Sequence, residues 1–220
     1  MAIKIFYHIS PSNHALEVVK EHIMAFHYSG LYTKADQILC FLSGGNDGAT
    51  AKAIAEFLLT AGKKIKIVAC DIEDTSYERF TLLRMHDFLE NSDIALYMHS
   101  KGVTHTSEPK RERTEDWTRI LAYHLIRYHE RCIGLLQQGY DIVGPGHSPA
   151  DCNPEHFSGN MWWVRGDYYK RLPRSIGPRY YDPEFYVCQI RPKTYCIFKT
   201  GINHYMCTYK MDNYVDMVLE

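Results

Sequence analysis

One stretch decides the fold of this chain: residues 38–48, which read ILCFLSGGNDG. Its five leading apolar residues predict a strand that is buried on both faces. The Ser-Gly-Gly-Asn-Asp-Gly run that follows is a strong turn signal, and residues 49–59 then present an Ala-rich face at helical spacing. A buried strand, a tight turn and a helix that packs on a sheet indicate one β-α unit of an α/β fold.

The same alternation continues on both sides of that unit. Further strands are expected at residues 3–9, 64–70 and 94–98, and further helices at residues 15–26 and 77–89. This rhythm favours a mainly parallel central sheet with helices on both faces. In such sheets ligands bind beyond the carboxyl ends of the strands. The places to look for a site are therefore the segments that follow Tyr7, Leu42, Cys70 and Met98.

The second half of the chain has a different pattern. Residues 115–138 read as one long helix, because apolar and aromatic residues recur near one face, and residues 141–143 read as a short strand. Gly, Pro, Asn and aromatic clusters then predict short strands, one helix near residues 167–172, and loops that complete the site. Because the chain shows no repeat and no linker, its 220 residues are expected to form a single domain.

Composition excludes several classes of protein. A formal net charge of −1 lacks the basic excess that phosphate-backbone binding requires, so no nucleic-acid partner is expected. The first residues are too short an apolar run for a signal peptide, and no apolar run is long enough to cross a membrane. Seven cysteines without a C-x-x-C pair indicate reduced thiols. The sequence therefore predicts a cytoplasmic protein without a transmembrane segment.

The first candidate for chemistry is the block YMHSKG at residues 97–102, which follows the fourth predicted strand. His99, Ser100, Lys101 and Gly102 together could form a cradle for a phosphate or diphosphate, since Lys101 supplies a positive charge and Gly102 lets the backbone approach an anion closely. A surface turn with incidental polar residues explains the block equally well. Its place at the carboxyl edge of a strand keeps it as a candidate.

The second candidate is the block HFSGNMWW at residues 156–163. Indole rings stack well on the apolar faces of sugars, and the side chains of Ser158 and Asn160 can hydrogen-bond sugar hydroxyls. Alternatively, Trp162 and Trp163 could both be buried residues that anchor the hydrophobic core. Because so many polar residues stand beside the paired tryptophans, we favour a sugar site here.

Two clusters of carboxylates are weaker candidates. Glu184, in the segment RYYDPE at residues 179–184, could act as a general base or stabilise positive charge at an anomeric carbon. Asp71, Glu73 and Asp74 end the third strand and could bind Mg²⁺ or Mn²⁺ through oxygen. Helix caps and surface charges explain such acidic residues at least as often, and for the second cluster we favour that explanation.

Familiar motifs of other enzymes are missing from the sequence. The glycine-rich run at residues 44–48 lacks the Gly-Lys-Ser/Thr ending of a P-loop, and no G-x-G-x-x-G follows the first strand. A G-x-S-x-G elbow is also absent. Kinases, dinucleotide dehydrogenases and α/β-hydrolases are therefore disfavoured.

Several blocks together resemble a family of small glycosyltransferase-like proteins found in bacteria and large DNA viruses. Those proteins carry, in order, a Tyr-x-His-Thr/Ser-Lys-Gly block, a Trp-Arg block and a His-Phe-Ser-Gly-Asn-x-Trp-Trp block. The corresponding blocks here are residues 97–102, residues 117–119 with an inserted Thr118, and residues 156–163. Residues 77–82 and the segment from Arg179 to Glu184 also match, so the resemblance covers roughly half of the chain.

The resemblance implies a GT-A-like, Rossmann-like fold with two functional halves. Residues 1–103 would bind the nucleotide, and residues 104–220 would bind the sugar and the acceptor. The implied activity is transfer of a sugar from a nucleoside-diphosphate sugar, for which UDP is our guess, to a hydroxyl acceptor such as a glycan. Such a protein could be one part of a larger glycan-building assembly.

Many GT-A enzymes hold a divalent metal with an Asp-x-Asp motif after the fourth strand, where this sequence has His99, Ser100 and Lys101. A Mn²⁺ or Mg²⁺ cofactor is therefore an open question, and its ligands are unknown. Lys101 could offset the diphosphate charge itself, or His99 and His156 could be ligands in a site with few carboxylates, although imidazole suits Mn²⁺ less well than carboxylate does.

The strand ends and the resemblance together lead us to assign the candidate residues to two groups. The nucleotide and diphosphate group comprises Tyr7, His8, Ser10, Asp71, His99, Lys101, Gly102 and His156. The sugar and acceptor group comprises Arg119, Ser158, Gly159, Asn160, Trp162 and Trp163. Glu184 and Lys101 are the expected catalytic residues. Two other functions stay open: a non-catalytic module that binds a nucleotide-sugar or a glycan, and a nucleotide phosphoesterase on the same sheet.

Overall fold

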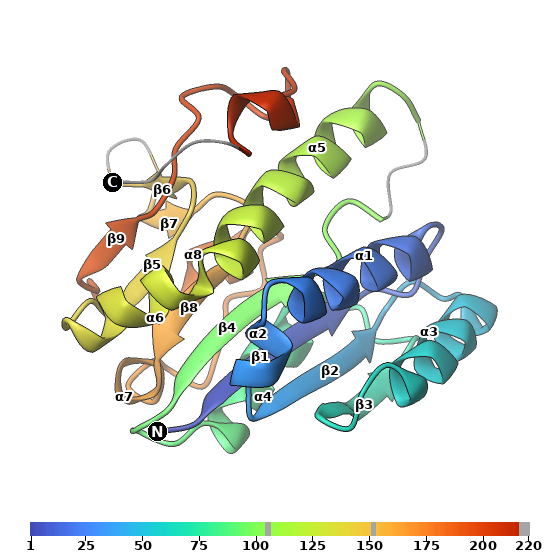
Figure 1. Cartoon of the computed structure of the whole chain (residues 1–220), viewed down its shortest axis with the longest axis horizontal. Coiled ribbons are helices and arrows are strands. Elements are labelled where there is room, and N and C mark those ends of the chain that lie inside the picture. Colours follow the sequence, from blue (N-terminus) through green and yellow to red (C-terminus); the bar gives the residue numbers. More distant parts are fainter. Residues whose placement is uncertain (104–106, 151–152, 216–220) are drawn as a thin grey trace.

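A seven-stranded sheet forms the centre of the protein (Figure 1). The structure is a computed structural model that describes residues 1–103, 107–150 and 153–215. The strand order is β3-β2-β1-β4-β8-β5-β9. The strands of this sheet are β1 (Ile3–Ile9), β2 (Gln37–Ser43), β3 (Ile65–Asp71), β4 (Ile94–His99), β5 (Ile142–Gly144), β8 (Trp162–Arg165) and β9 (Thr194–Cys196). A separate two-stranded ladder pairs β6 (His147–Ser148) with β7 (His156–Phe157).

Parallel pairing dominates the sheet. Strands β1, β2, β3 and β4 are all parallel, whereas β8 runs antiparallel to both of its neighbours, β4 and β5. The last pair, β5 with β9, is parallel again. This arrangement confirms the predicted fold class, an α/β protein with a mainly parallel central sheet.

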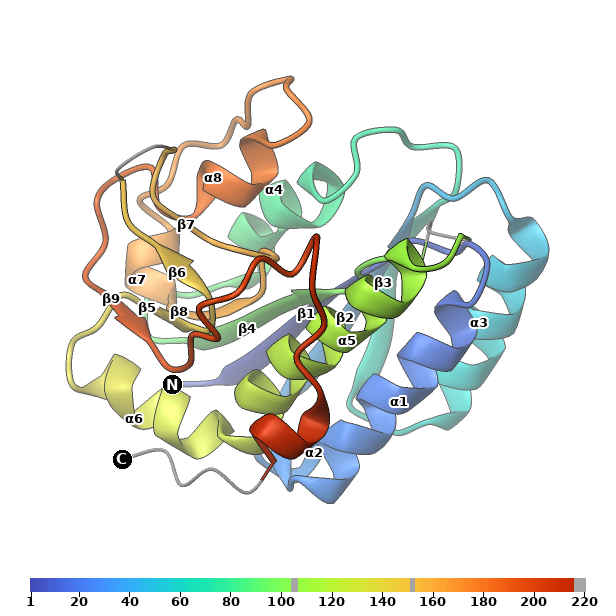
Figure 2. The same cartoon turned by 90° about the horizontal axis from the view of Figure 1, so that it is seen from above.

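Helices cover both faces of the sheet (Figure 2). One face carries α1 (Ala15–Tyr28), α2 (Leu31–Lys34), α3 (Gly48–Thr60), α5 (Lys110–Ala122) and α6 (His129–Gln137). The other face carries α4 (Arg79–Phe88), α7 (Gly166–Tyr169) and α8 (Asp182–Tyr186). Each layer encloses its own apolar core: neighbouring residues of β1 alternate between the two, with Tyr7 in the first core and Phe6 in the second.

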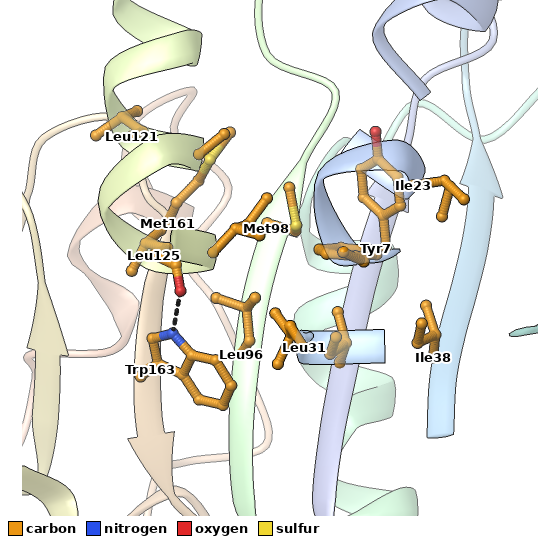
Figure 3. Close-up of a cluster of buried hydrophobic side chains, with 14 of the residues drawn as sticks. Tyr7, Ile23, Leu31, Ile38, Leu96, Met98, Leu121, Leu125, Met161 and Trp163 are labelled. Atoms are coloured by element: carbon orange, nitrogen blue, oxygen red, sulfur yellow. Dashed lines mark hydrogen bonds between the residues drawn. The ribbon is translucent and has the colours of Figure 1, made fainter. Parts of the chain in front are cut away.

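The predicted long helix is in fact three segments. It begins at Lys110 rather than at residue 115, and a π-helical turn, η1 (Tyr123–Arg127), separates α5 from α6. Within this turn the backbone oxygen of Leu125 accepts a hydrogen bond of 3.0 Å from Trp163 Nε1, which links the helix to β8 (Figure 3). Periodicity alone does not reveal such a π turn, because the apolar spacing on either side remains helical.

The glycine-rich turn between β2 and α3 has the structure that its sequence predicts. Gly44, Gly45 and Asn46 all have positive φ angles, which side chains other than Asn seldom tolerate. Asp47 then caps α3, because its carboxylate accepts a 3.0 Å hydrogen bond from the backbone nitrogen of Thr50. Across the described residues, no helix is both long enough and apolar enough to cross a membrane.

Candidate functional site

The carboxyl ends of β1 and β4 mark the centre of the candidate site. In the strand order β3-β2-β1-β4 the chain winds outward from β1 through β2 to β3 and then returns to place β4 on the other side of β1. Ligands of open α/β sheets bind at such a switch point. His8 and His99 are direct partners in the β1–β4 register at this edge. The sheet therefore brings together two residues that are 91 positions apart in the chain.

Both histidines are buried and uncharged near neutral pH. Burial is the main cause that lowers the pKa of His8 to about 4 and the pKa of His99 to about 3. His8 Nδ1 is hydrogen-bonded to the hydroxyl of Thr81 over 2.9 Å. His99 Nε2 lies 2.9 Å from the backbone oxygen of Gly159, which can only accept, so Nε2 carries the proton and Nδ1 holds a free electron pair.

Glu78 lies beside His99 and joins three segments of the chain. It immediately precedes α4, and its carboxylate accepts hydrogen bonds from the hydroxyl of Tyr97, over 3.1 Å, and from the side-chain amide of Asn160. His99 Nδ1 is 3.8 Å from Glu78 Oε1. The carboxylate is thus fixed by an amide and a phenol, while 24% of the side chain remains exposed to solvent.

Lys101 supplies a positive charge next to this carboxylate. Its ammonium group lies 4.3 Å from the ring centroid of Trp117 in α5, a cation–π contact. Burial lowers the pKa of Lys101, and the nearby carboxylates of Glu78 and Glu184 oppose that shift. The lysine therefore lies within the electrostatic range of two carboxylates that are 106 positions apart in the chain.

Glu184 completes the cluster from the first turn of α8. Its Oε1 accepts a 3.0 Å hydrogen bond from the backbone nitrogen of Gly159, and the adjacent Asn160 also donates to the backbone oxygen of Pro183 over 3.3 Å. Gly159 and Asn160 both have positive φ angles. The tight turn at these two residues therefore holds Glu78 and Glu184 on its two sides. We call Glu78, His99, Lys101, Asn160 and Glu184 the Glu78 cluster.

Five of the residues expected from the sequence are brought together here: His8, His99, Lys101, Asn160 and Glu184. Gly159 joins them through its backbone. Ser10 lies nearby, with its backbone nitrogen donating to the hydroxyl of Ser100 over 2.9 Å.

Other expected residues have different surroundings. His156 and Ser158 form their own pair, with 3.2 Å between Nε2 and the hydroxyl oxygen. Asp71 is exposed at the end of β3, where it accepts a hydrogen bond from the backbone of Glu73. Arg119 lies on α5, 3.9 Å from Glu21. None of these three contacts involves the Glu78 cluster.

Three expected roles need correction. Trp162 and Trp163 are both completely buried, so neither indole can stack on a sugar. Their ring nitrogens are bonded inside the protein, Trp162 to Asn160 Oδ1 over 2.8 Å and Trp163 to the backbone of Leu125. Tyr7 is also fully buried, and its hydroxyl is bonded to His22 Nδ1 over 2.8 Å. These large rings support the site from within the core and do not line it.

Gly102 is also explained by packing. It has a φ angle of 81°, and a Cβ atom at this position would collide with the methyl group of Thr114. A close approach to an anion is not needed to account for a glycine here.

Sequence reasoning assigned no role to Glu78 or Thr81, although both lie in the segment at residues 77–82 that matches the resemblance. Glu78 stands just before a helix, where a carboxylate is usually a capping residue. The signal that could have found it was its position directly ahead of the helix that leads to β4.

The cluster does not fit a divalent metal ion. Within the described parts of the chain, no three His, Cys, Asp or Glu side chains are grouped so that they could hold one ion. Glu78 is already bonded to Tyr97 and Asn160, and His99 Nε2 to Gly159. No chemical step is therefore derived through a metal here.

A cavity of about 750 Å³ opens between α1 and α5, and Lys101 forms part of its lining. Carboxylates and cations both line it, among them Glu17, Glu21, Glu115, Arg111, Arg119 and Lys101. A smaller cavity of about 220 Å³ lies between Trp117 and the segment at residues 145–148. Lys101 and Arg119, two of the residues expected from the sequence, thus share the lining of the larger cavity.

The fold and the cluster define an α/β protein with a polar site at the switch point of its sheet. Residues 4–201 match the family described as a domain of unknown function, DUF8361, and the chain belongs to that family. No curated protein sequence matches this chain significantly.

Several solved structures are similar to this chain at low sequence identity. A mycobacterial protein superposes with a TM-score of 0.52 at 12% identity, over 90% of this chain and 66% of that one. Glucosyl-3-phosphoglycerate synthase from Mycobacterium tuberculosis, solved with Mn²⁺, UDP and phosphoglyceric acid, gives a TM-score of 0.47 at 13% identity, over 83% of this chain and 61% of that one.

A mannosyltransferase from Pyrobaculum calidifontis, solved with GDP-Man and Mn²⁺, gives a TM-score of 0.45 at 11% identity, over 88% of this chain and 54% of that one. This chain therefore spans less than two thirds of the length of each of the three. At such identities the first match demonstrates a shared fold alone.

Proposed function

We propose that this protein is a glycosyltransferase that moves a sugar from a nucleoside-diphosphate sugar to a hydroxyl group of a glycan. One observation carries the proposal: Lys101 lies within electrostatic range of the carboxylates of Glu78 and Glu184 at the switch point between β1 and β4. A cation there can offset the charge of a diphosphate, and a carboxylate can accept the proton of an attacking hydroxyl.

The reaction would use the cation and a carboxylate in the same step. The acceptor oxygen forms a bond to the anomeric carbon of the donor sugar while the bond from that carbon to the diphosphate oxygen breaks. Glu184 takes the hydroxyl proton, or stabilises positive charge at the anomeric carbon, and Lys101 stabilises the departing nucleoside diphosphate. Glu78 is the less available base, because both Tyr97 and Asn160 donate hydrogen bonds to it.

The nucleotide belongs, in this proposal, to the half of the protein at residues 1–103. Ser10, beyond the end of β1, and Asp71, exposed at the end of β3, would contact the nucleotide. We favour UDP as the nucleoside diphosphate. The half at residues 104–220 would hold the donor sugar and the acceptor, with Ser158 at the sugar and His156 at the diphosphate. A cytoplasmic location and a place in a larger glycan-building assembly remain predictions of the sequence.

A binding module without turnover is the alternative, and the two hydrogen bonds that Glu78 Oε2 already accepts favour it. The two functions differ in how they respond to Glu184→Gln. The amide oxygen of Gln can still accept from Gly159, so the turn is kept while the base is lost. A transferase loses turnover, by about 100-fold or more for a general base, whereas a binding module keeps its affinity.

The first experiment is a thermal-shift screen with UDP, GDP, CMP and dTDP, each with and without Mn²⁺. A ligand that binds only the native state raises the melting temperature by mass action. Stabilisation by one nucleoside diphosphate supports the transferase, and its dependence on Mn²⁺ tests whether Lys101 works without a metal. If no nucleotide stabilises the protein, the proposed donor is wrong.

A further inference from the structure

Four tyrosines at the carboxyl edge of the sheet have unusually exposed rings. Tyr77, Tyr180, Tyr181 and Tyr205 are 58%, 69%, 58% and 61% exposed. They come from three separate segments: the residue before Glu78, the loop before α8, and a turn near residue 205. Large exposed aromatic rings that gather in one place mark binding surfaces more often than accidents of folding.

The rings contact one another or the edge of the cluster. Tyr77 and Tyr180 lie edge to face with 5.8 Å between their centroids, and Tyr180 and Tyr181 do so at 5.0 Å. Tyr205 lies edge to face with Trp117, with 5.1 Å between the ring centroids, and the ammonium group of Lys101 lies over the same Trp117 ring. The four tyrosines therefore form one surface, which we call the tyrosine rim.

The tyrosine rim lies beside the two carboxylates of the cluster, because Tyr77 directly precedes Glu78 and the backbone nitrogen of Glu184 donates to the backbone oxygen of Tyr181 over 3.0 Å. Desolvation of its hydroxyl, followed by the negative charge of Glu78, raises the pKa of Tyr180. Desolvation and then the charge of Glu184 raise the pKa of Tyr205 to about 12. Each phenol is thus close enough to sense a carboxylate, so a ligand that lies on the rings can also reach Glu78 and Glu184.

Specific contacts hold these rings in their exposed positions. The guanidinium group of Arg79 donates to the backbone oxygen of Gly177, over 2.6 and 2.8 Å, and to that of Arg179, which fixes the loop that carries Tyr180. Tyr77 has a φ angle of 54°, a left-handed conformation that costs free energy for a bulky residue. The fold thus maintains a strained backbone whose effect is to present an aromatic ring to solvent.

The chemistry of the rim fits a neutral sugar better than a charged partner. Tyrosine faces accept the C–H groups of a pyranose ring, and phenols and carboxylates accept hydrogen bonds from its hydroxyls. A basic peptide could also stack on tyrosine rings. The positive charge of Lys101 offsets part of the negative charge of the two carboxylates, however, so the site attracts such a peptide less strongly.

We propose that the tyrosine rim is the acceptor subsite and that its ligand is a neutral oligosaccharide, which lies across Tyr77, Tyr180, Tyr181 and Tyr205 and directs one hydroxyl towards Glu184. This assignment rests on the proposed transferase function for the fate of that hydroxyl, whereas binding of the oligosaccharide is independent of it. The tyrosines take the stacking role that the buried Trp162 and Trp163 cannot perform.

The test measures binding of four neutral tetrasaccharides, made of maltose-, cellulose-, chitin- and mannan-type linkages, to the full chain by calorimetry and by proton NMR. We expect at least one to bind, with upfield shifts of its C–H protons, because the sugar lies over aromatic rings. Tyr180→Ala combined with Tyr181→Ala should weaken binding about tenfold, and the matching Tyr→Phe pair should weaken it less than about threefold.

Tyr28→Ala is the matched control, because Tyr28 is 84% exposed at the end of α1, remote from the rim. The proposal is overturned if none of the four sugars binds, if the double Ala variant binds as the wild type does, or if Tyr28→Ala weakens binding equally. It is also overturned if a tetralysine peptide binds to the rim and the sugars do not.

The two proposals fail in different ways. Sugar binding that depends on the rim, without binding of any nucleotide in the thermal-shift screen, overturns the transferase and leaves the subsite intact. Nucleotide binding without rim-dependent sugar binding overturns the subsite alone.

Discussion

The backbone nitrogen of Gly159 donates a hydrogen bond to Glu184 Oε1 over 3.0 Å. The next residue, Asn160, donates to Glu78 through its side-chain amide. One turn of the chain therefore positions both carboxylates of the candidate site, and its geometry depends on a glycine. The consequences can be measured, because the chain offers a second glycine with nearly the same backbone conformation.

Gly159→Ala should destabilise the protein by about 2–4 kcal/mol for two reasons. The new Cβ atom would lie 2.5 Å from Leu121 Cδ1, and the alanine would have to adopt a φ angle of 91°. Gly139→Ala separates the steric clash from the cost of the positive φ angle. Gly139 has a φ angle of 95° but no atom within 4 Å of the added Cβ, so it should lose only the backbone part, about 1 kcal/mol. Urea denaturation measures both, and equal losses would contradict the packing argument.

Lys101→Met should lower turnover by about 100- to 1,000-fold and leave the melting temperature within a few degrees of the wild type. The methionine keeps an apolar stem on Trp117 but loses the charge that offsets the diphosphate. Lys193→Met is the matched control, because the Lys193 ammonium group also lies over an aromatic ring, 4.4 Å from the centroid of Tyr140. Full activity in Lys101→Met would refute the diphosphate assignment.

Trp163→Phe should cost about 2–4 kcal/mol of unfolding free energy without weakening sugar binding. The substitution removes buried volume and leaves the Leu125 carbonyl without the 3.0 Å hydrogen bond that it now accepts. Denaturation and tetrasaccharide titration on the same variant check both parts. A stable variant that has lost sugar binding would restore the surface role expected from the sequence.

Acid should destabilise the protein between about pH 6.5 and pH 4. Burial lowers the pKa of His8 to about 4 and the pKa values of His22 and His99 to about 3, whereas in the unfolded chain these groups titrate near 6.5. In that window the unfolded chain binds more protons, so each histidine reduces the unfolding free energy by about 1.4 kcal/mol per pH unit as pH falls.

The His22→Asn variant isolates one of these contributions. Its amide can keep a hydrogen bond to the hydroxyl of Tyr7 but does not titrate. The slope of unfolding free energy against pH, measured by urea denaturation at pH 7, 6 and 5, should therefore be shallower than in the wild type. An unchanged slope would show that His22 titrates normally in the folded protein.

The alternation of strands and helices in the first hundred residues was predictable because each unit is local. The strand at residues 38–42, its glycine-rich turn and the helix after it are specified by neighbours in the sequence, and the structure has all three. The antiparallel β8 and the position of α8 depend on contacts far apart in the chain, such as the pairing of Leu96 with Trp163. No local pattern encodes such a pairing.

The candidate site was predictable in its parts and unpredictable in its assembly. His99, Lys101 and Glu184 stood out through their neighbours in the sequence, whereas Glu78 resembled an ordinary helix-start carboxylate. Trp162 and Trp163 were misread because a pair of tryptophans is equally suited to a sugar site and to a core. Burial decides between those two roles, and burial depends on the antiparallel strand that carries them.

The π-helical turn at Tyr123–Arg127 has a consequence for how the chain can change over evolution. Each residue of a helix advances its direction by about 100°. Deleting one residue from this turn would restore regular α-helix and leave the direction of α6 nearly unchanged, because a π turn holds one residue more than an α turn, so Cys132, Ile133 and Leu136 would still face the core that they now fill. The turn therefore acts as a one-residue spacer, and a single-residue deletion should be tolerated better here than inside α5 or α6, where it would rotate everything downstream by about 100°.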